Sequence, residues 1–191
     1  MATQLLYPSA AGDLTQFNSV SSGTHWEAVD ESSADDDTSY ITSALDEGTL
    51  AFYIVIKENS TTTNISKSAT TSYANYSNEW TAKPSDSSAF TVTDINNLQI
   101  GVRFTGDDNP INQTDLFNIT DWPNSASDTI NSITVYARWK NSGAGAAAPR
   151  MRCTQVYVSV DYTAPAAVTT GPFKIEAGAH VKITSGKLTI K

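Results

Sequence analysis

The sequence predicts an all-β fold, a single β-sandwich with a jelly-roll-like arrangement and an extended β-tail after it. About a quarter of the 191 residues are Ser or Thr, which favour turns and the solvent faces of strands. Several segments alternate apolar and polar residues with a period of two, as strands do when one face is buried. Amphipathic helical spacing is missing from the sequence. Short alternating segments separated by turn residues are typical of sandwiches.

The first third of the chain has weaker signals. Residues 4–17 contain one short apolar run, broken by Pro8, and residues 26–29 form a short strand candidate. Residues 48–57 have apolar side chains on both faces, the pattern of a central strand. Residues 58–89 are polar with spaced aromatics, so we expect edge strands and loops there.

The later elements are clearer. Residues 93–98 resemble a short helical turn with a polar cap. Three segments then alternate cleanly and predict strands, at residues 98–104, 133–140 and 153–162. The segments between them, at 106–110 and 142–149, are rich in Gly, Ala or Asp and predict loops.

A change in composition after Tyr162 predicts the domain organisation. We expect the sandwich to occupy residues 1–163, a linker residues 164–172 and a C-terminal β-tail residues 173–191. The tail is basic, whereas the body is acidic. Its three very short strands bury too little surface to be stable alone, so they should add to another sheet. The expected docking residues are Phe173, Ile175, Val181, Ile183, Leu188 and Ile190.

Charge and composition narrow the function classes. The net charge is −8 and basic residues do not cluster, which argues against a nucleic-acid partner. The start of the chain lacks the basic and apolar regions of a signal peptide, and no segment has the length of apolar sequence that spans a bilayer. We therefore expect synthesis in a cytoplasm without a secretion signal and no membrane partner.

Residues suited to chemistry are scarce. The chain has two His residues, His25 and His180, and one cysteine. No Ser lies in a nucleophile elbow, and Cys153 has the setting of a small apolar filler. We predict a protein that is not an enzyme, with no catalytic residues and no cofactor.

Two binding sites are weighed against simpler interpretations. Asp35, Asp36 and Asp37 lie in an acidic run and are weak candidates for Ca²⁺ ligands. The run lacks EF-hand spacing, so a solvated turn without a metal is the favoured interpretation. Trp80, Trp122 and Trp139 could form a platform for a sugar, but they fit equally well in the core.

Several phrases together resemble a loosely defined family of phage and prophage-encoded virion structural proteins with a β-sandwich. They are WEAVDE at residues 26–31, DDDTSY at 35–40, TSYANYSNEW at 71–80, the segment 90–101 and CTQVYVSVDYT at 153–163. The resemblance covers most of residues 1–163 and none of the tail. It departs from the family in one respect, since the block at 115–145 follows the block at 48–104 instead of preceding it.

The resemblance implies a non-enzymatic structural protein on the virion surface of a tailed virus. We expect a capsid decoration or surface protein that docks through its tail on the major capsid protein or on sister subunits, and so a homo-oligomer. Two alternatives stay open. One is a carbohydrate-binding or receptor-binding module of a viral tail or fibre, which predicts an exposed aromatic cluster. The other is an extracellular filament subunit.

Overall fold

The structure, a computed structural model, describes residues 1–19, 23–43, 50–106, 112–141 and 150–166. The expected loop at 142–149, most of the predicted linker and the whole predicted tail lie outside the described residues. The six expected docking residues, Phe173, Ile175, Val181, Ile183, Leu188 and Ile190, are therefore not placed by the structure.

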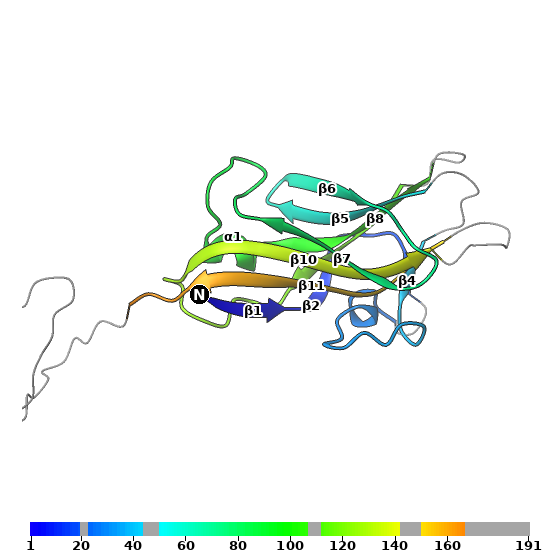
Figure 1. The fold of residues 1–191 in the computed structure, drawn as a ribbon, viewed down its shortest axis with the longest axis horizontal. Helices are drawn as coiled ribbons and strands as arrows, with labels where there is room; N and C mark the ends of the chain where they lie inside the picture. The colour runs from blue at the N-terminus through cyan, green and yellow to red at the C-terminus, as the bar shows by residue number, and fades with distance from the viewer. Residues whose placement is uncertain (20–22, 44–49, 107–111, 142–149, 167–191) are drawn as a thin grey trace, which may run out of the picture.

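Two antiparallel sheets pack face to face, which confirms the all-β sandwich (Figure 1). The six-stranded sheet has the order β3-β4-β11-β10-β7, with β1 also paired to β11. Its strands are β1 (Ala2–Leu6), β3 (Asn18–Ser19), β4 (Ile41–Thr42), β7 (Ala74–Trp80), β10 (Thr129–Asn141) and β11 (Met151–Thr163). The five-stranded sheet has the order β2-β9-β8-β5-β6. Its strands are β2 (Pro8–Thr15), β5 (Leu50–Glu58), β6 (Thr61–Lys67), β8 (Gln99–Gly106) and β9 (Asn112–Ile119).

The core lies between the two sheets and is made by the alternating positions that the sequence indicated. Phe52, Ile54 and Ile56 of β5 are at most 2% exposed. They face inward-pointing residues of β10 and β11, such as Val135 and Val158. Phe52 stacks on Trp139 across the sandwich, with ring centroids 6.1 Å apart. Close aromatic and aliphatic packing of this kind supplies most of the stability of a sandwich.

The predicted central strand and edge strands are confirmed. β5 is hydrogen-bonded on both sides, to β6 and to β8. The polar segment at residues 58–89 supplies β6 and β7, which each close one end of a sheet. The predicted helical turn is α1 (Val92–Asn96), where Thr91 and Asp94 form a reciprocal capping box.

The strand prediction at residues 26–29 is wrong. These residues begin the 3₁₀ helix η1 (Trp26–Ala28), in which the Ala28 and Val29 amides donate to the carbonyls of His25 and Trp26. Ala28 and Val29 are consecutive and both fully buried. Consecutive buried residues fit a helical turn at the end of the sandwich, whereas a half-buried strand alternates.

The first fifteen residues form two strands where the sequence showed only one short apolar run. The chain crosses from one sheet to the other at Tyr7 and Pro8, so β1 lies in the six-stranded sheet and β2 in the five-stranded sheet. β2 bulges between Ala11 and Thr15. The bulge brings Asp13 over β8 and β5, where its carboxylate accepts hydrogen bonds from Gln99 and Lys57. This irregularity hides the strand alternation in the sequence.

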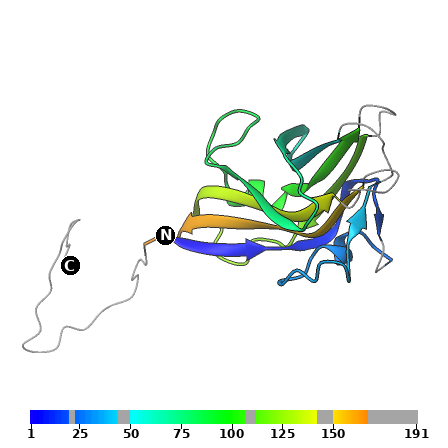
Figure 2. The ribbon, with the colours of Figure 1, turned by 45° about the vertical axis from the view of Figure 1, so that its right-hand side comes forward.

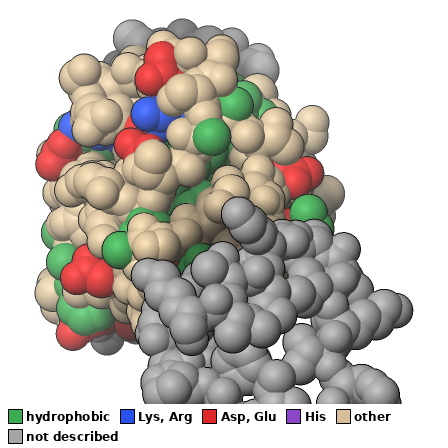
Figure 3. All heavy atoms as spheres, turned by 90° about the vertical axis from the view of Figure 1, so that its left-hand side faces the viewer, with side chains coloured by type: hydrophobic (Ala, Val, Ile, Leu, Met, Phe, Trp, Pro, Cys, Tyr) green, Lys and Arg blue, Asp and Glu red, His purple; other side chains and the backbone are tan. Residues whose placement is uncertain are grey.

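The described chain begins and ends at the same end of the sandwich (Figure 2). β1 runs antiparallel to β11, with Ala2 opposite Tyr162. Figure 3 looks onto this end and shows acidic side chains at several separate places, with Lys and Arg side chains confined to one area. Among the described residues, no helix has the length and apolar character needed to cross a membrane.

Candidate functional site

The outer face of the six-stranded sheet carries a row of tyrosine rings. Tyr136 of β10 lies opposite Tyr157 of β11, and their rings stack with centroids 4.8 Å apart and planes 9° apart. Tyr7, which follows β1, lies 5.7 Å from Tyr157. The row therefore crosses three neighbouring segments of the sheet. An aromatic cluster on the outside of a sheet needs an explanation that core packing does not give.

The next row of outward positions is polar. Arg138 of β10 lies opposite Asn75 of β7 on one side and Gln155 of β11 on the other. The register between β10 and β11 shifts here, because Trp139 pairs with Cys153 and leaves Thr154 as an extra residue. This β-bulge turns the Thr154 side chain toward a loop that folds over the sheet.

That loop, the acidic loop (residues 30–40), follows η1 and is fixed to β11 by hydrogen bonds. The Gln155 side-chain amide donates to the Glu31 carbonyl at 2.6 Å. The Thr154 hydroxyl donates to the Ser39 carbonyl at 2.9 Å. The Ser39 hydroxyl lies within hydrogen-bond distance of the carboxylates of Glu31 and Asp35, which share its one hydrogen. These bonds hold the loop as a rigid rim above the outer face of the sheet.

Ion pairs fasten the other half of the acidic loop. Arg138 donates from Nε and Nη2 to the two carboxylate oxygens of Asp36, at 2.6 and 2.9 Å. Asp37 accepts from Lys140 at 2.7 Å and from Arg152 at 3.1 Å. Asp36 has a φ of 55°, a left-handed conformation that Asp adopts more readily than most residues. The turn is thereby shaped to bring both carboxylates to the basic residues.

Ion pairing and burial shift the pKa values of the loop carboxyls in opposite directions. The hydrogen bond from Arg138 lowers the pKa of Asp36, and the one from Lys140 lowers the pKa of Asp37. Burial raises the pKa of Glu31 above its ordinary value. Glu31 Oε2 is buried without a hydrogen-bond partner among the described residues. Glu31 therefore carries the only desolvated carboxylate oxygen that the described part of this loop leaves unsatisfied.

The three Ca²⁺ candidates, Asp35, Asp36 and Asp37, instead make hydrogen bonds and ion pairs with other side chains of the same chain. Asp36 and Asp37 lie against cationic side chains, and Asp35 accepts hydrogen bonds from Ser39 and Thr154. Groups of three or more His, Cys, Asp or Glu residues arranged to hold a metal do not occur among the described residues. Sequence reasoning did not find these pairs, because only sheet register brings Arg152 opposite Lys140 and only loop docking brings the acidic run to both.

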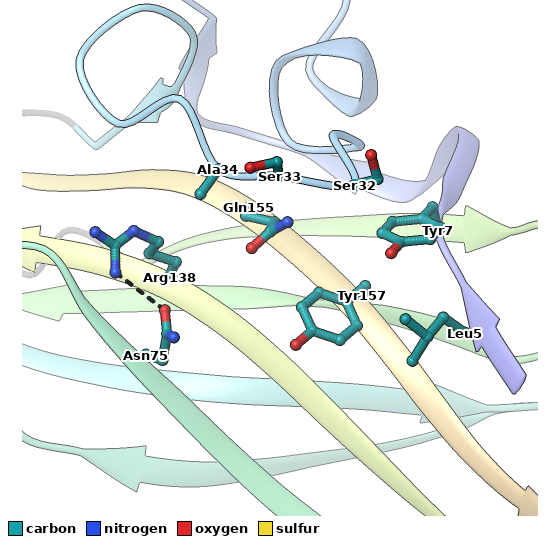
Figure 4. A pocket seen from close by; sticks show the side chains of 9 residues that line it. All are labelled: Leu5, Tyr7, Ser32, Ser33, Ala34, Asn75, Arg138, Gln155 and Tyr157. Atoms are coloured by element: carbon teal, nitrogen blue, oxygen red, sulfur yellow. Dashed lines mark hydrogen bonds between the residues drawn. The ribbon is translucent and has the colours of Figure 1, made fainter. Parts of the chain in front are cut away.

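A groove of about 340 Å³ lies between the acidic loop and the outer face of the sheet (Figure 4). Residues 32–34 of the loop form its rim, and Tyr157 and Gln155 of β11 form its floor. Its described lining is Leu5, Tyr7, Ser32, Ser33, Ala34, Asn75, Arg138, Gln155 and Tyr157. The volume is within the usual range for small-molecule sites. Sequence reasoning missed this groove, because its residues come from five separate segments.

The three tryptophans that were weighed as a sugar platform lie in the core, which is the other interpretation that the sequence left open. Trp80, Trp122 and Trp139 are 9%, 7% and 0% exposed and belong to the core. The Trp122 indole also donates to Asp128 at 3.0 Å. The aromatic side chains of the outer face are tyrosines. A tyrosine can face solvent because its hydroxyl hydrogen-bonds to water, whereas the larger indole rings are packed in the core.

The structure brings His25 next to a carboxylate far away in sequence. The His25 Nδ1 atom lies 2.6 Å from Oδ2 of Asp115, which is fully buried. The other Asp115 oxygen accepts from the Gln16 and Phe17 amides. Burial raises the pKa of the nearby Cys153 thiol to about 12, so it stays protonated and unreactive at neutral pH. This cluster joins segments of the fold and lacks an activated nucleophile among the described residues. His180 lies outside them.

Comparison of the chain with family models, with curated proteins and with solved structures finds no match. The resemblance to virion structural proteins therefore stays a prediction from the motifs. The structure gives most of those motifs a shared location, because the segments at residues 26–31, 35–40, 71–80 and 153–163 meet around the acidic loop and β11.

Proposed function

We infer that this protein is a non-enzymatic structural protein on the surface of a tailed virus. In this proposal, residues 1–163 form the exposed body, and residues 173–191 dock on the capsid or on a sister subunit by adding a strand to a sheet. Weak single contacts then add up over many copies on a lattice.

The observation that carries the proposal is the open edge of β1. Among the described residues, β1 pairs with β11 alone, so the backbone groups of its other edge have no strand partner. Ala2 of β1 lies opposite Tyr162 on the paired edge, so β1 begins close to the point where the described chain leaves β11. In this proposal, the tail of each subunit leaves β11 near the start of β1. The open edge of that β1 then accepts the tail of a neighbouring subunit. Unpaired edges of this kind accept strands from other chains.

The polar chemistry of the described body also supports a structural role. Asp36 and Asp37 of the acidic loop pair with Arg138, Lys140 and Arg152 on the outer face of the sheet, and His25 pairs with the buried Asp115. Such contacts stabilise one rigid shape, and recognition by surface complementarity needs that rigidity.

The test compares the full chain with a chain that lacks residues 171–191. Sedimentation should show assembly of the full chain and a monomer for the truncated chain, with unchanged circular dichroism and thermal unfolding. Virus particles purified from the source organism should contain the full chain. A truncated chain that joins particles at full occupancy overturns the docking role, and filaments formed by the purified full chain would favour a filament subunit instead.

A second pair of variants tests the acceptor edge. Thr3→Lys places a charge on exposed β1 and should reduce assembly at least about tenfold. Thr62→Lys makes the same change on β6, one of the two edge strands of the other sheet, and should leave assembly unchanged. Equal effects of the two substitutions would remove β1 as the acceptor.

A further inference from the structure

We propose that the groove between the acidic loop and the outer tyrosine row is a carbohydrate-binding site for a neutral sugar. The proposal goes beyond the structural role above and does not depend on the tail. It rests on the shape of the groove, on the polar atoms that the fold leaves free in it and on its charge balance.

The floor of the groove offers apolar surface together with hydroxyl groups. Leu5 is 42% exposed, an unusual exposure for a large aliphatic side chain, and lies beside Tyr7 and Tyr157. Burial raises the pKa of the Tyr157 hydroxyl, with smaller effects from Tyr136 and Tyr7, so it stays a neutral donor and acceptor. A sugar ring likewise combines an apolar C–H face with a rim of hydroxyls, so floor and ligand match.

The rim supplies hydrogen-bonding atoms that no described residue uses. Ser32 and Ser33 are exposed, and their hydroxyls make no hydrogen bond to another described residue. Gln155 donates its amide to the loop, which fixes the side chain and leaves Oε1 as a free acceptor. Asn75 accepts from Arg138 at 3.1 Å through Oδ1, which leaves its Nδ2 donor free (Figure 4). Planar groups held in place in this way select the directions of ligand hydroxyls at little entropic cost.

The charge balance favours a neutral ligand over an acidic one. Arg138 is the one cation of the described lining, and Asp36 holds it in a bidentate pair. Glu31 and Asp35 flank the rim residues 32–34 in sequence. An incoming carboxylate or phosphate would therefore meet neutralised arginine and repelling acids. Hydroxyl groups meet no such opposition.

The experiment titrates the full chain with neutral oligosaccharides that end in glucose, galactose, mannose or N-acetylhexosamine, and with sialylated and uronate-containing oligosaccharides. Isothermal calorimetry gives the affinities. We expect at least one neutral sugar to bind with Kd of about 1 mM or tighter, and the acidic set to bind more weakly. Binding by no neutral sugar, or tighter binding by the acidic set, overturns the proposal.

Three variants locate the site. Tyr157→Ala removes the centre of the floor, and Ser33→Trp fills the groove from an exposed position. Each should weaken binding at least about tenfold while thermal unfolding shows a folded protein. Tyr53→Ala removes a matched tyrosine from the five-stranded sheet, where Arg103 lies 5.8 Å from its ring, and should bind as the wild type does. Wild-type affinity in both groove variants would place the sugar elsewhere and refute the assignment.

Discussion

The carboxylate of Asp115 accepts a hydrogen bond from the His25 imidazole, 2.6 Å away, although 90 residues separate the two in the chain. Asp115 lies on β9 and is fully buried, whereas His25 immediately precedes η1. The same carboxylate accepts from the amides of Gln16 and Phe17 just after β2. One side chain thus joins three segments at one end of the sandwich.

Removing this carboxylate should destabilise the fold strongly. Asp115→Ala leaves two backbone amides and an imidazole without their buried acceptor, and we expect the free energy of unfolding to fall by about 3 kcal/mol. His25→Ala removes one of these bonds and should cost about 1 kcal/mol. Urea denaturation followed by tryptophan fluorescence measures both. Exposed Asp121→Ala is the control and should change little; a similar loss there would show a general charge effect instead.

Gly101 should be the least replaceable of the described glycines. A Cβ atom at this position would lie 1.9 Å from the Asp115 carbonyl oxygen on the neighbouring strand, and backbone cannot move aside without breaking the sheet. Gly101→Ala should lower the free energy of unfolding by about 3 kcal/mol or more. Gly23→Ala is the matched control, because nothing lies within 4 Å of its added Cβ. Equal stability of the two variants would contradict the close approach of β8 and β9.

The Asp36–Arg138 pair should make the thermal stability of the protein depend on pH in the acid range. The pKa of Asp36 is lowered in the folded state, so its contribution is present above the ordinary value of 3.8 and is lost as the pH falls through the folded pKa. Tm should therefore fall on acidification below about pH 4. In Arg138→Met this fall should become shallower, because the lowered pKa returns toward its ordinary value. Lys67→Met removes a cation that has no carboxylate partner among the described residues, and should keep the wild-type slope.

Cys153 should be protected from thiol reagents until the protein unfolds. It is 0% exposed, and burial raises the pKa of its thiol to about 12. Reaction with a disulfide reagent at neutral pH should be at least about 100-fold slower in buffer than in concentrated urea. Ser77→Cys adds a thiol on exposed β7 and should add one fast-reacting group to the native protein. Fast labelling of the unmodified native chain would mean that this part of the core opens readily.

The strands that the sequence predicted best are those with one face on the core. In β10 and β11, every second residue is buried over most of the strand. Burial of one face therefore produces the alternation of apolar and polar residues in the sequence. The pattern failed at residues 26–29, where burial follows a single helical turn, and in β2, where a bulge interrupts the alternation. Local irregularities of this kind depend on contacts with distant strands, such as those of Asp13 with β8 and β5.

The sequence by itself determined the fold class, the main strands and the scarcity of reactive side chains, because these follow from composition and from periods of two residues. Only the tertiary structure decided which side chains meet. It paired the acidic run with Arg138, Lys140 and Arg152, it placed the tryptophans in the core, and it assembled a groove from β1, β7, β10, β11 and the acidic loop. The physical reason is that sheet register and loop docking join residues about 100 positions apart, and no local pattern contains that information.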